Sequence, residues 1–259
     1  MGGQGWHRQA HGQQYRRLEL RHFLQPCPTP SLRANMNTET ARFNMIEQQI
    51  RPWDVLDAHV LALLANMRRE DFVPQSKRAM SFMDVQIPLL DGQADGPRML
   101  EPKLEARILQ ALALQRHESA LEIGTGSGFM AALMSHRAMQ VHTLECDPEL
   151  AARARTKLRR SGLLNVEVHE VPAAQGALGL ADEAPFDAIA LSGSVAAVPR
   201  VLLEQLKVGG RLVAVVGYEP VMVARLFTRA GPTEWSERDL FDTVVPRLQG
   251  FVEPGRFTF

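Results

Sequence analysis

The sequence predicts an α/β protein with a doubly wound, mostly parallel sheet. From residue 118 onward, short apolar segments alternate with helical segments at the spacing of βαβ units. The first of these strands lies in ALEIGTGSGF, residues 120–129, and runs directly into three glycines set at every second position. Sheets of this class bind ligands beyond the carboxyl ends of their strands, so this junction is the predicted binding site.

The segment before the sheet is expected to be helical. Residues 40–51 place Phe43, Ile46 and Ile50 on one helical stripe, and Asp57 is a suitable N-cap for a second helix. The other elements expected here are that second helix at 57–67, a loop at 84–97, and a helix that opens at Glu101 and Pro102 and carries Leu104, Ile108, Ala111 and Leu112 at helical spacing.

The alternating half supplies the strands of the sheet. After Gly217 the helices stop, and two strand-like pieces could form an antiparallel pair at the sheet edge. The expected strands are 119–123, 140–145, 165–169, 186–191, 211–216, 221–228 and 241–248, and the expected helices are 127–138, 148–161 and 198–207.

Composition limits the classes of partner. The 259 residues suit one domain, and 29 Lys plus Arg balance 29 Asp plus Glu, which argues against a protein that grips nucleic acid by its phosphates. We expect no membrane span because no apolar run is long enough. The two cysteines, Cys27 and Cys146, predict no structural disulfide and a reducing, cytoplasmic setting. The eight histidines show no ligand spacing, so no metal site is predicted.

The N-terminus differs from the rest of the chain. Residues 1–35 are rich in Gly, Gln, Arg and His and contain one acidic residue, Glu19. We interpret them as a disordered extension, or as the result of a start codon assigned too early, with translation from Met36. Residues 36–259 then form a single domain, with a helical lid region at 36–102 and a cofactor-binding sheet at 103–259.

The glycine loop favours S-adenosylmethionine over a dinucleotide. Phe129 stands where the dinucleotide fingerprint G-x-G-x-x-G requires its third glycine. Glu122 precedes the loop, and an acid there suits a sulfonium better than a pyrophosphate. Glu145 follows Gly124 by 21 residues and can accept from ribose hydroxyls, a feature that nicotinamide sites share. The expected cofactor contacts are Glu122, Gly124, Thr125, Gly126, Ser127, Gly128, Glu145 and Cys146.

Four further stretches resemble the protein-L-isoaspartate O-methyltransferase family. They are FVP at 72–74, APFDAIAL at 184–191, VPRVLLEQLKVGGRLVAVVG at 198–217 and VVPRL at 244–248, and with the glycine loop the resemblance runs from about Thr40 to about Gly250. It implies a seven-stranded methyltransferase (Rossmann-like) sheet with added N-terminal helices. It also implies methylation of the α-carboxylate of L-isoaspartyl residues in damaged proteins, after which the ester collapses to a succinimide.

Two positions depart from the family's pattern. The family carries G-Q-T-I-S-x-P before the glycine loop, whereas this chain reads GPRMLEP at 96–102, with Arg98 and Leu100 in place of the hydroxyl residues. After the third strand the family has Gly-Asp-Gly, with the Asp on the adenine amine, whereas this chain has Val171, Pro172 and Ala173. The resemblance therefore adds Pro172 and Ala173 to the expected cofactor contacts. Loss of one such hydrogen bond would weaken cofactor binding about tenfold.

The acceptor side is open to more than one interpretation. Arg98 could bind an acceptor carboxylate bidentately, or it could be a solvated loop arginine near Asp95 and Glu101. Ser192 and Ser194 could contact the substrate or cap the following helix. The alternatives to isoaspartyl repair are a methyltransferase with a small-molecule acceptor, such as a carboxylate, and a non-catalytic module that binds a cofactor or a partner. The sequence gives no oligomeric state.

Overall fold

The computed structural model describes residues 1–2, 30–93 and 96–253, and the chain divides into two compact units, Met1–Thr38 and Glu39–Phe259. Most of the extension predicted at 1–35 falls on residues 3–29, outside the described residues. Helix α1 (Pro30–Met45) crosses the boundary between the units, so 30–35 are helical. Among the described residues, no helix combines the length and apolarity that a membrane crossing requires.

The helix predicted at 40–51 is not α-helical throughout. α1 gives way to a π-helical turn, η1 (Ile46–Ile50), and a 3₁₀ turn, η2 (Arg51–Trp53). Ile46 and Ile50 are buried as predicted, but the Phe43 side chain is 62% exposed, so its assignment to the buried stripe was wrong. The wider π turn shifts the angular register, and Met45 takes the buried position instead.

Three elements then lead toward the sheet. α2 (Ala58–Asn66) begins at the predicted cap, where the Asp57 carboxylate accepts from the N–H groups of His59 (2.7 Å) and Val60 (3.1 Å). The loop predicted at 84–97 contains a short strand, β1 (Ile87–Pro88), which pairs antiparallel with β2 (Arg98–Met99) just after the loop. α3 (Pro102–Leu112) starts at the predicted proline and buries the predicted face, except for partly exposed Ala111. The remaining short helices in this region are η3 (Arg69–Asp71) and η4 (Gln75–Met80).

The sheet has seven strands in the order β5-β4-β3-β6-β7-β8-β9. The five strands from β5 to β7 run parallel, and β8 and β9 add an antiparallel edge. The doubly wound fold is therefore confirmed. The elements are β3 (Ser119–Ile123), α4 (Phe129–Ser135), β4 (Gln140–Glu145), α5 (Pro148–Arg160), β5 (Val166–Glu170), α6 (Ala173–Gly176), η5 (Ala181–Glu183), β6 (Phe186–Val195), α7 (Arg200–Glu204), β7 (Leu206–Tyr218), β8 (Val221–Arg229) and β9 (Trp235–Asp242).

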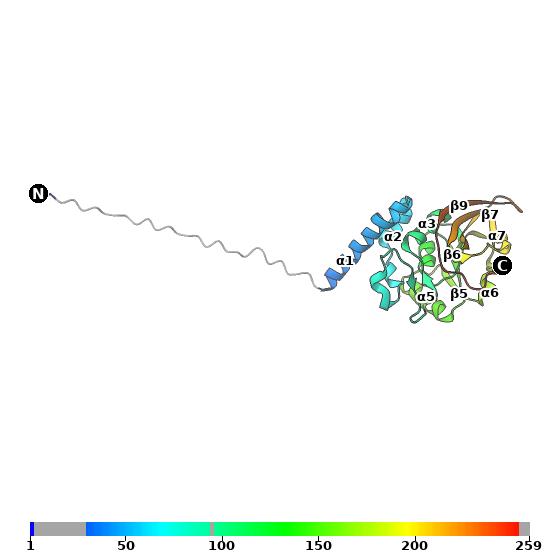
Figure 1. Ribbon diagram of the computed structural model, residues 1–259, viewed down its shortest axis with the longest axis horizontal. Coiled ribbons are helices and arrows are strands. Elements are labelled where there is room, and N and C mark those ends of the chain that lie inside the picture. Colours follow the sequence, from blue (N-terminus) through cyan, green and yellow to red (C-terminus); the bar gives the residue numbers. More distant parts are fainter. Residues whose placement is uncertain (3–29, 94–95, 254–259) are drawn as a thin grey trace. The chain divides into compact units, whose positions relative to one another are not determined.

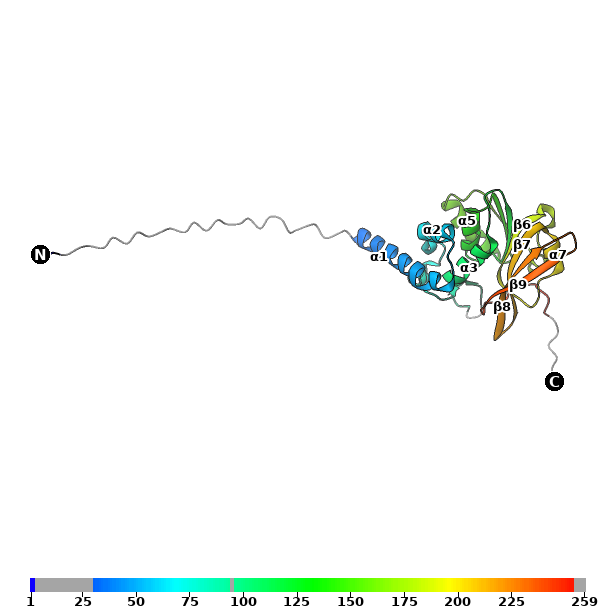
Figure 2. The same ribbon diagram turned by 90° about the horizontal axis from the view of Figure 1, so that it is seen from above.

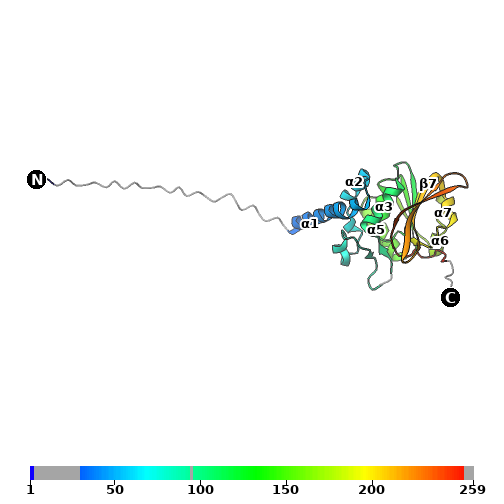
Figure 3. The same cartoon turned by 45° about the horizontal axis from the view of Figure 1, so that its top comes forward.

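Helices cover both faces of this sheet. Figures 1 and 2 show α3 and α5 on one face and α7 on the other, and Figure 3 shows β7 crossing between them. The apolar residues divide in the same way. Ala120 packs in the cluster that holds α3, α4 and α5, whereas its neighbour Leu121 packs in the cluster that holds Leu202 of α7. Alternate residues of one strand thus serve two cores, as a central parallel strand requires.

The final strand lies earlier in the chain than the sequence predicted. β9 ends at Asp242, and the segment predicted as a strand at 241–248 forms one isolated parallel bridge, between Ser194 and Arg247. Pro246 has no N–H to continue a ladder. β9 itself is an exposed edge strand with a mostly polar sequence, WSERDLFD, so it carries no apolar pattern by which to predict it.

Candidate cofactor and acceptor site

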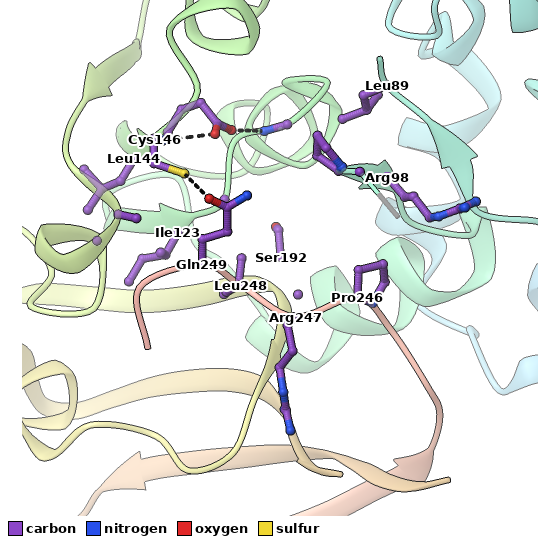
Figure 4. Close-up of a pocket in the computed structure, with 18 of the residues that line it drawn as sticks. Leu89, Arg98, Ile123, Leu144, Cys146, Ser192, Pro246, Arg247, Leu248 and Gln249 are labelled. Carbon is purple, nitrogen blue, oxygen red and sulfur yellow. Dashed lines mark hydrogen bonds between the residues drawn. The ribbon is translucent and has the colours of Figure 1, made fainter. Parts of the chain in front are cut away.

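A cavity of about 350 Å³ opens where the strand order reverses. The chain leaves β3 for β4 and β5 on one side and returns to β6 on the other, and the carboxyl ends of these strands border the cavity. Figure 4 shows side chains from the strand ends and from a C-terminal segment around this space. The lining residues are Leu89, Gly96, Pro97, Arg98, Leu100, Ile123, Gly124, Gly126, Leu144, Glu145, Cys146, Val171, Ala173, Gly176, Ser192, Gly193, Pro246, Arg247, Leu248 and Gln249.

The three glycines form the loop at the end of β3, on one side of the cavity. All have positive φ, with +93° at Gly124, +51° at Gly126 and +83° at Gly128, which caps α4. A Cβ on Gly124 would lie 2.7 Å from a methyl carbon of Leu248, so the absence of a side chain keeps this edge open. Gly124 and Gly126 line the cavity, whereas Gly128 faces α5 behind the loop.

Glu145 connects the glycine loop to β4. One carboxylate oxygen accepts from the N–H of Gly126 (2.7 Å), and the other accepts from those of Cys146 (2.9 Å) and Asp147 (3.0 Å). A carboxylate offers about four lone-pair sites, so three backbone bonds orient this group and leave about one site for a ligand. Because Glu145 and Cys146 both line the cavity, the structure places these two predicted residues at the site.

Glu122 lies beneath the cavity rather than in its wall. Its side chain is fully buried, and its carboxyl oxygens accept from the hydroxyls of Ser192 (2.6 Å) and Thr143 (2.7 Å). Burial raises the pKa of Glu122 to about 8, against the opposing effect of these hydrogen bonds. The group is therefore mostly protonated at neutral pH and does not supply the negative charge that the sequence suggested for a sulfonium. Thr125 lies in the same buried network, with its hydroxyl 2.7 Å from that of Thr143.

The two serines of β6 have different surroundings. The pairing of β6 with β7 is irregular between Ala190 and Ser194, and Ser192 and Gly193 line the cavity within this irregular segment. Ser194 is buried, and its hydroxyl donates to the Val245 carbonyl (2.9 Å). Ser192 is thus placed to touch a ligand, whereas Ser194 anchors the C-terminal segment. Neither side chain forms an N-terminal cap of α7.

The segment 96–100 forms another wall of the cavity. Arg98 and Leu100 both line the cavity, and in Figure 4 the Arg98 side chain extends away from Cys146 and Gln249. The Leu100 carbonyl accepts from the buried Arg69 guanidinium (2.7 Å), which also pairs with Glu105. Burial raises the pKa of Glu105 to about 7 although Arg69 opposes the shift. The hydrogen bond from Arg69 thus holds the backbone at Leu100, which forms part of the cavity wall.

Sequence reasoning missed the C-terminal segment 246–249. Leu248 approaches Gly124 and Gly193, and the Cys146 thiol donates to the Gln249 side-chain oxygen (3.9 Å). The bridge to Ser194 holds this segment across the end of β6, so it closes part of the cavity. The sequence signal that could have located this segment at the site was VVPRL at 244–248, which we predicted only as part of a strand.

The remaining predicted residues divide between the wall and its surroundings. Ala173 lines the cavity, and its neighbour Pro172 does not. Ser127 lines a separate hollow beside α5, where its hydroxyl accepts from the Phe129 N–H (3.1 Å). Although no metal site was predicted, the fold brings together His142, Glu167 and His169 on the strands next to the cavity.

Comparison with known proteins identifies the family. The model of the protein-L-isoaspartate(D-aspartate) O-methyltransferase family matches residues 40–245. The protein-L-isoaspartate O-methyltransferase 2 of Marinobacter nauticus is 38% identical over 206 residues, which cover 79% of this chain and 91% of that relative. The chain belongs to the protein-L-isoaspartate O-methyltransferase family. It is accordingly an S-adenosylmethionine-dependent methyltransferase, as the sequence predicted.

A further relative agrees with this assignment, and solved structures share the fold. The protein-L-isoaspartate O-methyltransferase 2 of Pelobacter propionicus is 41% identical over 192 residues, 74% of this chain and 81% of that relative. A solved protein-L-isoaspartate O-methyltransferase matches the fold with a TM-score of 0.69 at 23% identity, over 84% of this chain and 66% of that one. A beta-aspartate methyltransferase from Plasmodium falciparum, in complex with S-adenosyl-L-homocysteine, matches with a TM-score of 0.64 at 18% identity, over 82% and 98%.

Proposed function

We propose that the protein binds S-adenosylmethionine in this cavity and transfers its methyl group to the α-carboxylate of L-isoaspartyl residues in damaged proteins. The observation that carries the proposal is the glycine loop. Its positive-φ backbone lies at the switch point of the sheet, against a carboxylate, Glu145, that three N–H groups orient toward the cavity. This arrangement suits the adenosine of the cofactor, with Glu145 on the ribose.

The chemistry needs orientation rather than a base. The acceptor carboxylate is ionised at neutral pH because its pKa is near 4. S-adenosylmethionine, when bound, would supply the methyl group: an O–C bond to the carboxylate would form as the S–C bond breaks, which would leave the methyl ester and S-adenosylhomocysteine. The rate then depends on how well the carboxylate is aligned with the S–CH₃ bond in a site from which water is excluded.

We assign the alignment of the acceptor to Ser192. The family's hydroxyl positions hold Arg98 and Leu100 here, and Ser192 presents a hydroxyl to the same cavity from β6. Its oxygen lies 2.6 Å from a carboxyl oxygen of Glu122, and Glu122 is mostly protonated at neutral pH. In the structure Ser192 donates to Glu122, but a protonated Glu122 can reverse this hydrogen bond and donate to the Ser192 oxygen, which would free the Ser192 proton for the acceptor carboxylate.

A small-molecule carboxylate is the second candidate acceptor. The observation that favours it is the replacement of both family hydroxyls by Arg98 and Leu100, since these residues change the wall that an isoaspartyl peptide would contact.

The free thiol of Cys146 supports a reducing compartment, and we place the protein in the cytoplasm. The balanced charge supports a partner other than nucleic acid.

Methyl transfer to a matched peptide pair tests the proposal. Calorimetry with S-adenosylmethionine first establishes that the cofactor binds. Transfer of labelled methyl groups is then measured with an isoaspartyl peptide and with the aspartyl peptide of the same sequence. We expect base-labile label on the isoaspartyl peptide alone. Cofactor binding without transfer to either peptide would favour the small-molecule acceptor, and absence of cofactor binding would leave a partner-binding module.

A further inference from the structure

We propose that His142, Glu167 and His169 form a binding site for a divalent transition-metal ion of the Zn²⁺ class, with Glu183 orienting His142. The site lies on β4, on edge strand β5 and beside η5. None of its residues lines the cavity of the cofactor site. His142 is three residues before Glu145 on β4, which places the two side chains roughly 10 Å apart along the strand.

Strand register brings the three ligands together. His142 pairs with Glu167, and Leu144 pairs with His169, so both β5 side chains project from the same face of the sheet as His142. The ligand atoms of the three residues all lie within 4.8 Å of one another. The two imidazole rings are stacked with their centroids 5.3 Å apart at an interplanar angle of 28°.

The distances suit a metal ion. The Nδ1 atom of His142 lies 3.1 Å from the Nε2 atom of His169. Two nitrogens bound to one tetrahedral Zn²⁺ at 2.0–2.1 Å would lie about 3.3 Å apart. The carboxylate of Glu167 is 3.9 Å from the same Nδ1 atom, and its side chain is 59% exposed, so it has room to approach. Two imidazoles and a carboxylate suit Zn²⁺, with water completing the coordination.

Glu183 supplies the second observation. Its carboxylate lies 3.9 Å from Nε2 of His142, on the opposite edge of the ring from His169. A carboxylate there favours a proton on Nε2 and leaves the lone pair on Nδ1, which points at the other two ligands. Carboxylate–histidine–metal arrangements orient metal ligands through a hydrogen bond, which the half-exposed Glu183 side chain would form by closing the remaining gap when the ion binds.

The site has a structural consequence for the fold. β5 is the edge strand of the sheet, and an ion shared with β4 would hold the two strands together. Val171 and Ala173, which follow β5, line the cofactor cavity. An ion that binds the folded protein in preference to the unfolded chain raises the unfolding temperature by mass action. We therefore expect metal to stabilise the edge of the sheet that leads to the cofactor site.

Zinc titration of the full-length, metal-free protein tests the site. Affinity and stoichiometry are measured by competition with a chromophoric chelator, and thermal unfolding is followed with and without Zn²⁺. We expect one tightly bound ion and a higher unfolding temperature in its presence. His169→Ala should lower the affinity at least about tenfold, and Glu183→Gln about 10- to 100-fold although it removes no ligand. His169 is partly exposed, so its variant avoids a cavity in the core.

Controls separate this site from the other histidines and from the thiols. His136→Ala removes a histidine at the end of α4, and a triple Ala variant of His7, His11 and His22 removes those of the N-terminal extension. Both should bind Zn²⁺ as the parent does. Substituted Co²⁺ should lack the strong near-ultraviolet charge-transfer band that cysteine ligation produces. Unchanged affinity in a folded His169→Ala, or loss of binding in the triple variant, would overturn the proposal. So would absence of binding in the parent, which would leave His142 and His169 as a hydrogen-bonded pair.

Discussion

The two sides of the cavity are built in different ways. The cofactor side consists of Gly124, Gly126 and Glu145, and backbone geometry sets it: positive φ values and N–H groups directed at one carboxylate. The acceptor side consists of the wall at 96–100, Ser192 and the segment 246–249, which come from three distant parts of the chain. Side-chain networks hold the acceptor side, namely Arg69 on the Leu100 carbonyl and Ser194 on the C-terminal segment.

This difference indicates which half of the site can accept substitutions. The cofactor side tolerates little change, because a side chain on the glycine loop would meet Leu248 or force an unfavourable φ. On the acceptor side, Arg98 and Leu100 line the wall where the family resemblance implies hydroxyls, and Ser192 lines the same cavity from β6. A function carried by a side chain can move to a neighbouring element, whereas a function carried by backbone conformation cannot.

The largest expected effect tests the rigidity of the cofactor side. Gly124→Ala places a Cβ at a φ of +93° and 2.7 Å from Leu248. Strain and displacement of the loop together should cost about 2–3 kcal/mol, so S-adenosylmethionine affinity should fall about a hundredfold, measured by calorimetry. Gly162→Ala is the matched control, because Gly162 has a φ of +73° but open space around it. Parent-like affinity in Gly124→Ala would contradict the backbone account.

An intermediate effect concerns the buried acid between the two sides. The pKa of Glu122 rises from its usual value near 4.5 to about 8 in the folded protein. Between these pH values the unfolded chain releases a proton that the folded protein retains. The contribution of Glu122 to the free energy of unfolding is therefore present in full below pH 4.5 and is lost as pH rises to about 8. A glutamine at position 122 does not titrate, so Glu122→Gln should not lose this stability as pH rises. Between pH 5 and pH 8 its free energy of unfolding should therefore increase by at most about 4 kcal/mol relative to that of the parent.

Urea unfolding at pH 5 and at pH 8 measures this difference. Glu105, whose pKa is also raised, is present in both proteins, so its own titration contributes to both stability profiles. Parallel stability profiles for Glu122→Gln and the parent would show that Glu122 is ionised in the folded protein. The proton that we assign to the Ser192 pair would then be absent.

The smallest expected effect concerns Arg98. Its side chain lines the cavity but extends away from Cys146 and Gln249 in Figure 4. We expect Arg98→Ala to change the KM for an isoaspartyl peptide by no more than about threefold, the range of a solvent-screened surface charge. A tenfold rise in KM in the folded variant, with unchanged cofactor affinity, would instead assign acceptor binding to this guanidinium.

The sequence predicted what local patterns determine. β3 and β4 have the predicted bounds, Asp57 caps α2, and the glycine loop lies at the switch point because periodicity and glycine spacing are local signals. The misses depend on long-range contacts. Burial of Glu122 beneath the cavity, the closing segment at 246–249 and the meeting of His142 with His169 all depend on strand register and packing, which spacing along one chain does not contain.

Turnover of an isoaspartyl peptide by Ser192→Ala tests most directly the claim that this residue aligns the acceptor. At saturating cofactor, we predict that kcat falls about tenfold, the value of one positioning hydrogen bond, and that S-adenosylmethionine affinity stays within about twofold of the parent. Ser194→Ala should keep kcat and lose about 1 kcal/mol of stability, because its hydroxyl only anchors the C-terminal segment. A Ser192→Ala protein that turns over the peptide as fast as the parent would contradict the account.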